Sequence, residues 1–99
     1  MIRHLVLFKL NEGVAHDDPR VAEAIAAFQG LDQRVTELRS WEFARNFSDR
    51  PIAYDYAINS SVEDRDALQR YLAHPDHQAG AALWRAIATW VIADYEIET

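Results

Sequence analysis

The first ten residues constrain the fold more than any other stretch of this chain. Apolar side chains occupy both faces of residues 1–10 when the segment is drawn as a strand, because successive side chains of a strand point to opposite faces. The richer face carries Ile2, His4, Val6, Phe8 and Leu10. This pattern predicts a strand that is covered on both sides, with His4 pointing into the interior or into a pocket.

Residue patterns further along the chain alternate between helical and extended periods. Asp17-Asp18-Pro19 is typical of a helix start, and apolar residues follow it at helical spacing. Alternating apolar residues predict strands over residues 38–47 and 52–60, and an apolar run predicts a final strand over residues 90–97. Ser60 and a glutamate three residues later form a capping-box pattern, which predicts a helix before that final strand.

The expected last helix is interrupted by Tyr71-Leu72-Ala73-His74-Pro75-Asp76-His77, which places a phenol and two imidazoles around a proline. Proline breaks one helix and can occupy the first turn of the next, with His74 as the cap. His77 then falls in that first turn, where the positive helix end favours a neutral ring. Beside the Tyr71 phenol, a neutral imidazole is a credible proton acceptor. The alternative is that both side chains only fix the angle between the helices.

The order strand, helix, strand, strand, interrupted helix, strand matches the α+β ferredoxin-like unit, a four-stranded antiparallel sheet with helices on one face. We expect one domain over residues 1–99. The other sheet face would expose large apolar groups, and a second copy of the chain is the economical cover. The sequence therefore predicts a homodimeric α+β barrel, with Trp41, Phe43 and Phe47 as interface aromatics.

Composition narrows the possible functions. A formal charge of −6 with dispersed basic residues disfavours nucleic-acid binding, and no apolar stretch approaches membrane-spanning length. The absence of cysteine excludes disulfides and thiolate chemistry. His74 and His77 alone are a weak metal pair, so we expect no metal and no cofactor. The first residues lack the features of a signal peptide, and we expect a cytoplasmic protein.

Five segments occur in an order that points to a known family: Ile2–Leu10, Trp41–Asn46, Tyr54–Ala57, Tyr71–His77 and Val91–Glu96. Together they resemble the stress-responsive A/B barrel (Dabb) family of dimeric α+β barrel proteins, nearly from the first residue to the last. The family includes plant stress proteins, many bacterial members, and olivetolic acid cyclase. That plant enzyme closes a linear polyketide by an aldol step without metal or organic cofactor.

The resemblance implies a pocket between the sheet and the helices. By position, His4, Tyr71 and His77 match three residues that line the pocket of the cyclase, and they are our candidate catalytic residues. The fourth matching position, a third-strand histidine in the cyclase, is a tyrosine here, which removes a titratable base. The candidate substrate-binding residues are Tyr56, Phe8 and Val6.

The leading hypothesis is a homodimer whose apolar pocket binds or transforms a small aromatic or polyketide-like molecule. The chemistry would be of the cofactor-free cyclase, isomerase or lyase type, with His77 taking a proton next to a carbonyl and Tyr71 holding the enolate oxygen. A non-catalytic stress-response or assembly protein is one alternative. A cofactor-independent monooxygenase is another, by fold analogy alone. Room for a ligand beside Tyr71 and His77 would favour the leading hypothesis.

Overall fold

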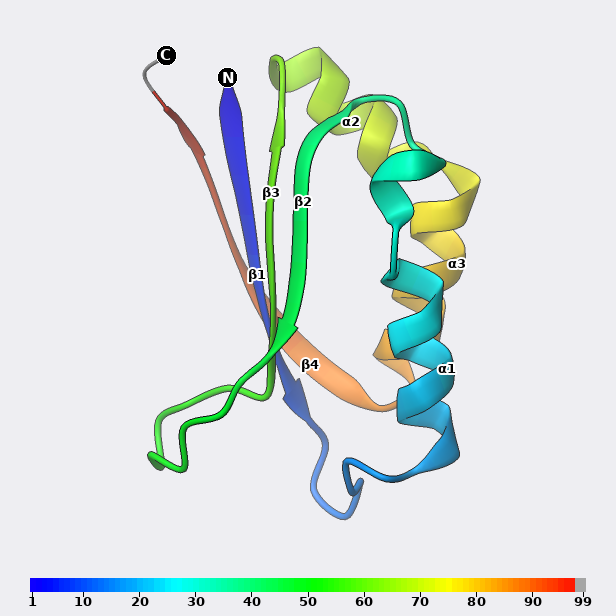
Figure 1. Ribbon diagram of the computed structural model, residues 1–99, viewed down its shortest axis with the longest axis vertical. Helices are drawn as coiled ribbons and strands as arrows, with labels where there is room; N and C mark the ends of the chain where they lie inside the picture. Colours follow the sequence, from blue (N-terminus) through cyan, green and yellow to red (C-terminus); the bar gives the residue numbers. More distant parts are fainter. Residues whose placement is uncertain (98–99) are drawn as a thin grey trace.

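The computed structural model describes residues 1–97, so the last two residues of the expected domain lie outside the described part. The sheet consists of β1 (Ile2–Leu10), β2 (Leu38–Arg45), β3 (Tyr56–Val62) and β4 (Ala88–Glu96). The helical elements are α1 (Pro19–Phe28), the short 3₁₀ helix η1 (Leu31–Gln33), α2 (Arg65–Ala73) and α3 (Pro75–Arg85). The antiparallel strands are ordered β2-β3-β1-β4, with the helices on one face (Figure 1). The predicted ferredoxin-like fold is confirmed.

The strand register places alternate side chains on two different surfaces. His4 of β1 lies opposite Ser60 of β3 and Asp94 of β4, and all three are on the face that carries the helices. Val6 and Phe8 follow on the same face and are buried. The even-numbered face of β1 is therefore the core face, as its apolar pattern predicts.

Aromatic rings fill the space between this face and the helices. Trp84 of α3 is fully buried and stacks on Phe8 with 4.6 Å between ring centroids. Trp41 and Phe43 of β2 pack against the same core, where both contact Phe28 of α1. The prediction that Trp41 and Phe43 are interface aromatics is therefore wrong, because their side of β2 faces the helices.

Several predicted boundaries differ from the structure. The strands predicted over residues 38–47, 52–60 and 90–97 are observed over Leu38–Arg45, Tyr56–Val62 and Ala88–Glu96. The third strand begins at Tyr56, not at residue 52, because its ladder with β1 ends at the Phe8–Tyr56 pair. Instead, the Asp55 side chain accepts a hydrogen bond from the Leu10 amide at 2.8 Å. Ser60 does not cap α2, since it stays within β3 and donates its hydroxyl to the His4 carbonyl. Asp64 caps α2 and accepts from the Ala67 amide.

The break between α2 and α3 occurs where the proline predicts it. His74 is the last cap of α2 and the first of α3, and its Nδ1 accepts a hydrogen bond from the Asp76 amide at 3.0 Å. Pro75 occupies the first turn of α3, where its missing N–H costs nothing. His77 follows in that turn, so the predicted position of this side chain is confirmed.

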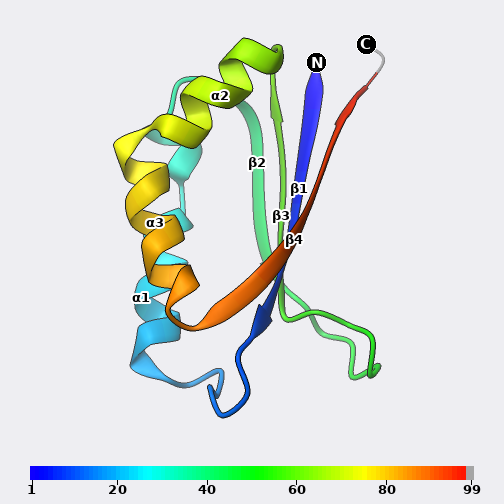
Figure 2. The same ribbon diagram turned by 180° about the vertical axis from the view of Figure 1, so that it is seen from behind.

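The opposite face of the sheet carries no helix and is partly apolar. Leu7, Val91 and Tyr95 on this face are each between 43% and 50% exposed. The β2–β3 loop, residues 46–55, projects on the same side, and its Phe47 is fully exposed (Figures 1 and 2). Within residues 1–97, no helix is long and apolar enough to cross a membrane.

Candidate functional site

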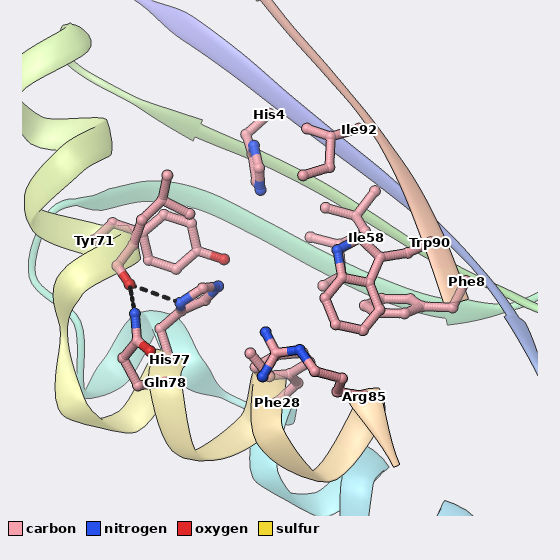
Figure 3. Close-up of a pocket in the computed structure, with 13 residues that line it drawn as sticks. His4, Phe8, Phe28, Ile58, Tyr71, His77, Gln78, Arg85, Trp90 and Ile92 are labelled. Atoms are coloured by element: carbon pink, nitrogen blue, oxygen red, sulfur yellow. Dashed lines mark hydrogen bonds between the residues drawn. The ribbon is translucent and has the colours of Figure 1, made fainter. Parts of the chain in front are cut away.

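A cavity of about 120 Å³ lies between the sheet and helices α2 and α3 (Figure 3). It is lined by His4, Val6, Phe8, Phe28, Ile58, Tyr71, Leu72, His77, Gln78, Ala81, Arg85, Trp90 and Ile92. The strands contribute mostly apolar side chains, and the helices contribute most of the polar ones. Such a lining is typical of small-molecule pockets, which combine an apolar wall with a few converging polar groups.

His77 presents one ring nitrogen to this cavity because the other is engaged by the backbone. Its Nδ1 lies 2.9 Å from the carbonyl oxygen of Leu72, across the proline break. A carbonyl only accepts, so Nδ1 carries the hydrogen and Nε2 is left as an acceptor. Burial lowers the pKa of His77, which keeps the ring neutral near pH 7. The expectation of a neutral imidazole is supported, with desolvation rather than the helix end as the main cause.

His4 is held in the same way by a carboxylate. Its Nδ1 bonds to Oδ1 of Asp94, its cross-strand neighbour on β4. A carboxylate accepts hydrogen bonds, so Nδ1 donates and Nε2 is directed away from the pair. The ring of His4 is buried, whereas the Asp94 side chain is 38% exposed. The pair thus connects His4, which lines the cavity, with Asp94 on the edge strand β4.

Tyr71 lies between these two imidazoles. Its ring centroid is 4.8 Å from that of His77 and 5.7 Å from that of His4. The side chain is fully buried, and its hydroxyl has no hydrogen-bond partner within residues 1–97. Burial raises the pKa of Tyr71 well above its usual value, so the phenol remains a protonated donor. Figure 3 shows the hydroxyl directed toward the cavity.

Tyr56 lies elsewhere. Its buried ring contacts Phe43 and Trp84, and its hydroxyl lies 2.9 Å from Nδ1 of His16 in the loop after β1. Tyr56 is not among the residues that line the cavity, whereas Val6 and Phe8 are. The large ring of Trp84 separates the third-strand position from the Tyr71 end of the core. Tyrosine at this position, where the cyclase has histidine, therefore makes a polar contact with His16 and does not line the cavity of Tyr71 and His77.

Sequence reasoning missed three polar contributors to the site. Asp94 is 90 positions from His4, so only the strand register reveals the pair. Gln78 follows His77 and donates to the same Leu72 carbonyl at 2.7 Å. Arg85 is the last residue of α3 and lines the cavity. It follows His77 by eight residues, which places both side chains on one face of the helix. That helical spacing is a signal that could have identified Arg85.

The site has no features of a metal centre. Within the described residues, no group of three or more His, Asp or Glu side chains is arranged to hold a metal ion. The two imidazoles that reach the cavity are also committed through Nδ1 to a carbonyl and a carboxylate. What the arrangement offers chemically is one protonated phenol, Tyr71, beside the neutral Nε2 acceptor of His77 and the carboxylate-paired ring of His4.

The fold and this site define a class, the small ferredoxin-like α+β proteins with a pocket between sheet and helices. Within it, the chain belongs to the family described as the stress responsive A/B barrel domain, whose model matches residues 2–97. An uncharacterized protein of Streptomyces coelicolor is 68% identical over 96 residues, which cover 97% of this chain and 99% of that protein. The resemblance predicted from five sequence segments is confirmed.

Two solved structures extend the comparison. A dimeric ferredoxin-like protein of unknown function from Thermobifida fusca has a TM-score of 0.84 and 28% identity, covering 97% of this chain and 90% of its own. A hydroxynitrile lyase from Passiflora edulis has a TM-score of 0.78 and 18% identity, covering 98% and 93%. The lyase shares the fold, and at this identity the likeness carries nothing more.

Proposed function

We propose that the protein is a homodimeric α+β barrel that binds a small aromatic or polyketide-like carbonyl compound and catalyses proton transfer on it without a cofactor. The reaction class is that of an isomerase, cyclase or lyase. Tyr71, His77 and His4 are the proposed catalytic residues, and Val6 and Phe8 belong to the apolar wall that holds the ligand.

The buried Tyr71 hydroxyl is the observation that carries this proposal. A buried polar group without a partner costs about 1–3 kcal/mol. Within residues 1–97, Trp41 Nε1 and Trp84 Nε1 also lack a partner, but Tyr71 is the member of this group that lines the cavity. A ligand oxygen in the cavity would supply the missing acceptor. A tyrosine that served only to fix the helix angle would gain more from a bond to the protein itself.

The chemistry follows from the fixed tautomer of His77. A ligand carbonyl that accepts from Tyr71 has its neighbouring carbon beside Nε2 of His77. His77 takes a proton from that carbon, the electron pair moves onto the carbonyl oxygen, and Tyr71 stabilises the resulting enolate. The proton returns to carbon at the same or another position. His4, oriented by Asp94, is the second imidazole beside the same hydroxyl.

The cavity volume limits the size of the ligand. An apolar cavity of about 150 Å³ in another protein accommodates benzene, so a ligand enclosed in about 120 Å³ is at most a single small ring or a short chain. The small-aromatic end of the predicted range is therefore favoured over an extended polyketide. The non-catalytic alternative fits less well, because it leaves both this space and the Tyr71 hydroxyl without a role.

Dimerisation through the bare sheet face is part of the proposal. Leu7 and Val91 lie on that face, in a mostly apolar groove that Glu42 and Asn59 also border. Exposed apolar patches of this kind are typical of interfaces. The Thermobifida fusca relative is described as dimeric. Pairing of two such faces would cover the groove and leave each cavity on the opposite side of its own sheet.

Deuterium exchange provides the test of the catalytic step. Acetophenone, a small aromatic ketone, would be incubated with the protein in D₂O, and loss of its methyl proton signal followed by NMR. We expect the protein to accelerate exchange and His77→Gln to abolish the acceleration, because glutamine cannot act as a base. His16→Gln is the matched control, since His16 bonds to Tyr56 and does not line the cavity.

The outcomes separate the candidate functions. Exchange that is equally fast with His77→Gln would contradict the assigned base. If acetophenone binds but its exchange is not accelerated, the proposed catalysis is refuted and only the binding function remains. Neither binding nor exchange, together with loss of the folded dimer on His77→Gln, would favour the non-catalytic assembly protein predicted as the alternative.

A further inference from the structure

Arg85 is the charged side chain of the cavity lining that the proposed chemistry does not use. It is the last residue of α3, and its guanidinium carbon lies 5.6 Å from the centre of the Trp90 ring. A guanidinium over an indole face is attracted by the ring, which favours one position for a long side chain. Arg85 and His77 both line the cavity, and Figure 3 shows the guanidinium turned toward the same space as the Tyr71 hydroxyl.

We propose that the ligand of this cavity carries a carboxylate and that Arg85 binds it. This inference rests on the proposed function and narrows its substrate class to small aromatic or unsaturated carboxylic acids. The carboxylate would sit at the Arg85 end of the cavity, and the reacting carbonyl or double bond at the Tyr71 end.

The first argument is that Arg85 has no carboxylate of its own. Within residues 1–97, five of the nine arginines form ion pairs with aspartate or glutamate, and Arg85 is the one of the other four that lines the cavity. Asp94, the carboxylate bonded to a cavity residue, is committed to His4. An unpaired guanidinium at a cavity offers a fork of donors that matches a carboxylate.

The second argument is the charge balance of the lining. Tyr71 and His77 are neutral near pH 7 and Gln78 is uncharged, while His4 is paired with Asp94. The guanidinium is therefore the uncompensated charge of the cavity. The whole chain carries a formal charge of −6, which repels anions in general. A local cation is what an anionic ligand would need in order to bind this protein at all.

The third argument concerns orientation. The cavity wall formed by Phe28, Trp90 and Ile92 is apolar and would hold a ring without fixing its direction. A carboxylate bound at one end would determine which carbon faces Nε2 of His77. Holding the reacting atoms in one orientation is itself a large contribution to catalysis. Arg85 is thus proposed as a specificity residue and not as a group that acts on the reacting carbon.

Benzoate and benzamide are the matched probes, because they have nearly the same shape and differ in charge. We expect the wild-type protein to bind benzoate about tenfold more tightly than benzamide, measured by calorimetry at low salt. Since Arg85 is solvent-exposed, a larger ratio is not expected. Arg85→Gln should remove the preference by weakening benzoate and leaving benzamide unchanged. Arg65→Gln, remote from the cavity on α2, is the control and should preserve the ratio.

The possible results distinguish this inference from the proposed function. Equal binding of both probes to the wild type would refute the proposal that the ligand carries a carboxylate, but not the proposal that the cavity binds a ligand. A preference for benzoate that survives Arg85→Gln would overturn the role of Arg85. If neither probe binds, and acetophenone also fails to bind, the pocket itself is refuted and this inference with it.

Discussion

Replacing Tyr71 by phenylalanine should stabilise the protein and weaken its ligand binding at the same time. The buried hydroxyl has no partner within residues 1–97, so its removal relieves a desolvation cost of about 1–3 kcal/mol. Even 1 kcal/mol would raise the melting temperature by about 4–8 °C in a domain of this size. A ligand that accepts from this hydroxyl would lose about 1 kcal/mol, or roughly fivefold in affinity.

Tyr56→Phe is the matched control because it deletes the same atom from an equally buried ring. The Tyr56 hydroxyl is bonded to His16 at 2.9 Å, so its loss should destabilise the protein by about 0.5–1.5 kcal/mol and leave ligand affinity unchanged. Urea unfolding and acetophenone titration would be measured on both variants. If Tyr71→Phe is destabilising to the same extent as Tyr56→Phe, the hydroxyl is satisfied in the free protein and the reasoning fails.

Three other predictions concern pH, assembly and packing. Because burial lowers the pKa of His77, the unfolded chain binds a proton there first, so the free energy of unfolding should fall as pH drops through about 6.5 and below. His77→Gln should flatten this dependence in urea titrations between about pH 8 and about pH 5; an unchanged slope would count against a buried neutral ring. Val91→Glu, on the bare sheet face, should give folded monomers in sedimentation experiments, whereas dimers that persist would show that another surface mediates assembly. Gly80→Ala would place a Cβ 2.3 Å from a Phe28 ring carbon and should cost about 1–3 kcal/mol on thermal unfolding. Phe28→Leu in the same chain should restore part of that loss, and no recovery would mean that the contact is not the cause.

The sheet and its two faces could be predicted because they depend on how apolar and polar side chains alternate within each strand. The alternation in residues 1–10 identifies a strand whose even-numbered side is buried, and the structure places His4 on that side. The same reasoning failed for Trp41 and Phe43. Alternation shows that one side of a strand is covered, but an interface and a helical layer produce the same apolar pattern.

The end of a strand depends on its partner, which a single segment does not reveal. Residues 52–55 continue the alternation of β3, yet Ile52 is 76% exposed. The hydrogen-bonded ladder starts at the Phe8–Tyr56 pair, and beyond it the Leu10 amide donates to the Asp55 side chain instead of to a strand carbonyl. Asp94 was missed for a similar reason, since its role exists only once β4 is in register with β1.

The Tyr71–His77 segment was informative because proline imposes a geometry that needs no long-range partner. The break at Pro75 leaves the Leu72 carbonyl without its usual helical donor, and the His77 and Gln78 side chains supply two. The same bond that satisfies the broken helix fixes the tautomer of His77. The structural and the catalytic interpretations of this segment are therefore not exclusive, since the helix break is what prepares the base.

The period of two in β4 also separates assembly from ligand binding along a single strand. Val91 borders only the groove on the bare face, whereas Ile92, the next residue, lines the cavity and also borders that groove. Because β4 is an edge strand, the helices leave Ile92 partly exposed, and the cavity opens at that edge. A dimer formed through the bare face would then stiffen the strand that carries Asp94 and Trp90 without covering the cavity. In the proposed dimer, the second copy would support the sheet from the face opposite the site, which would add to the limited core of so small a domain.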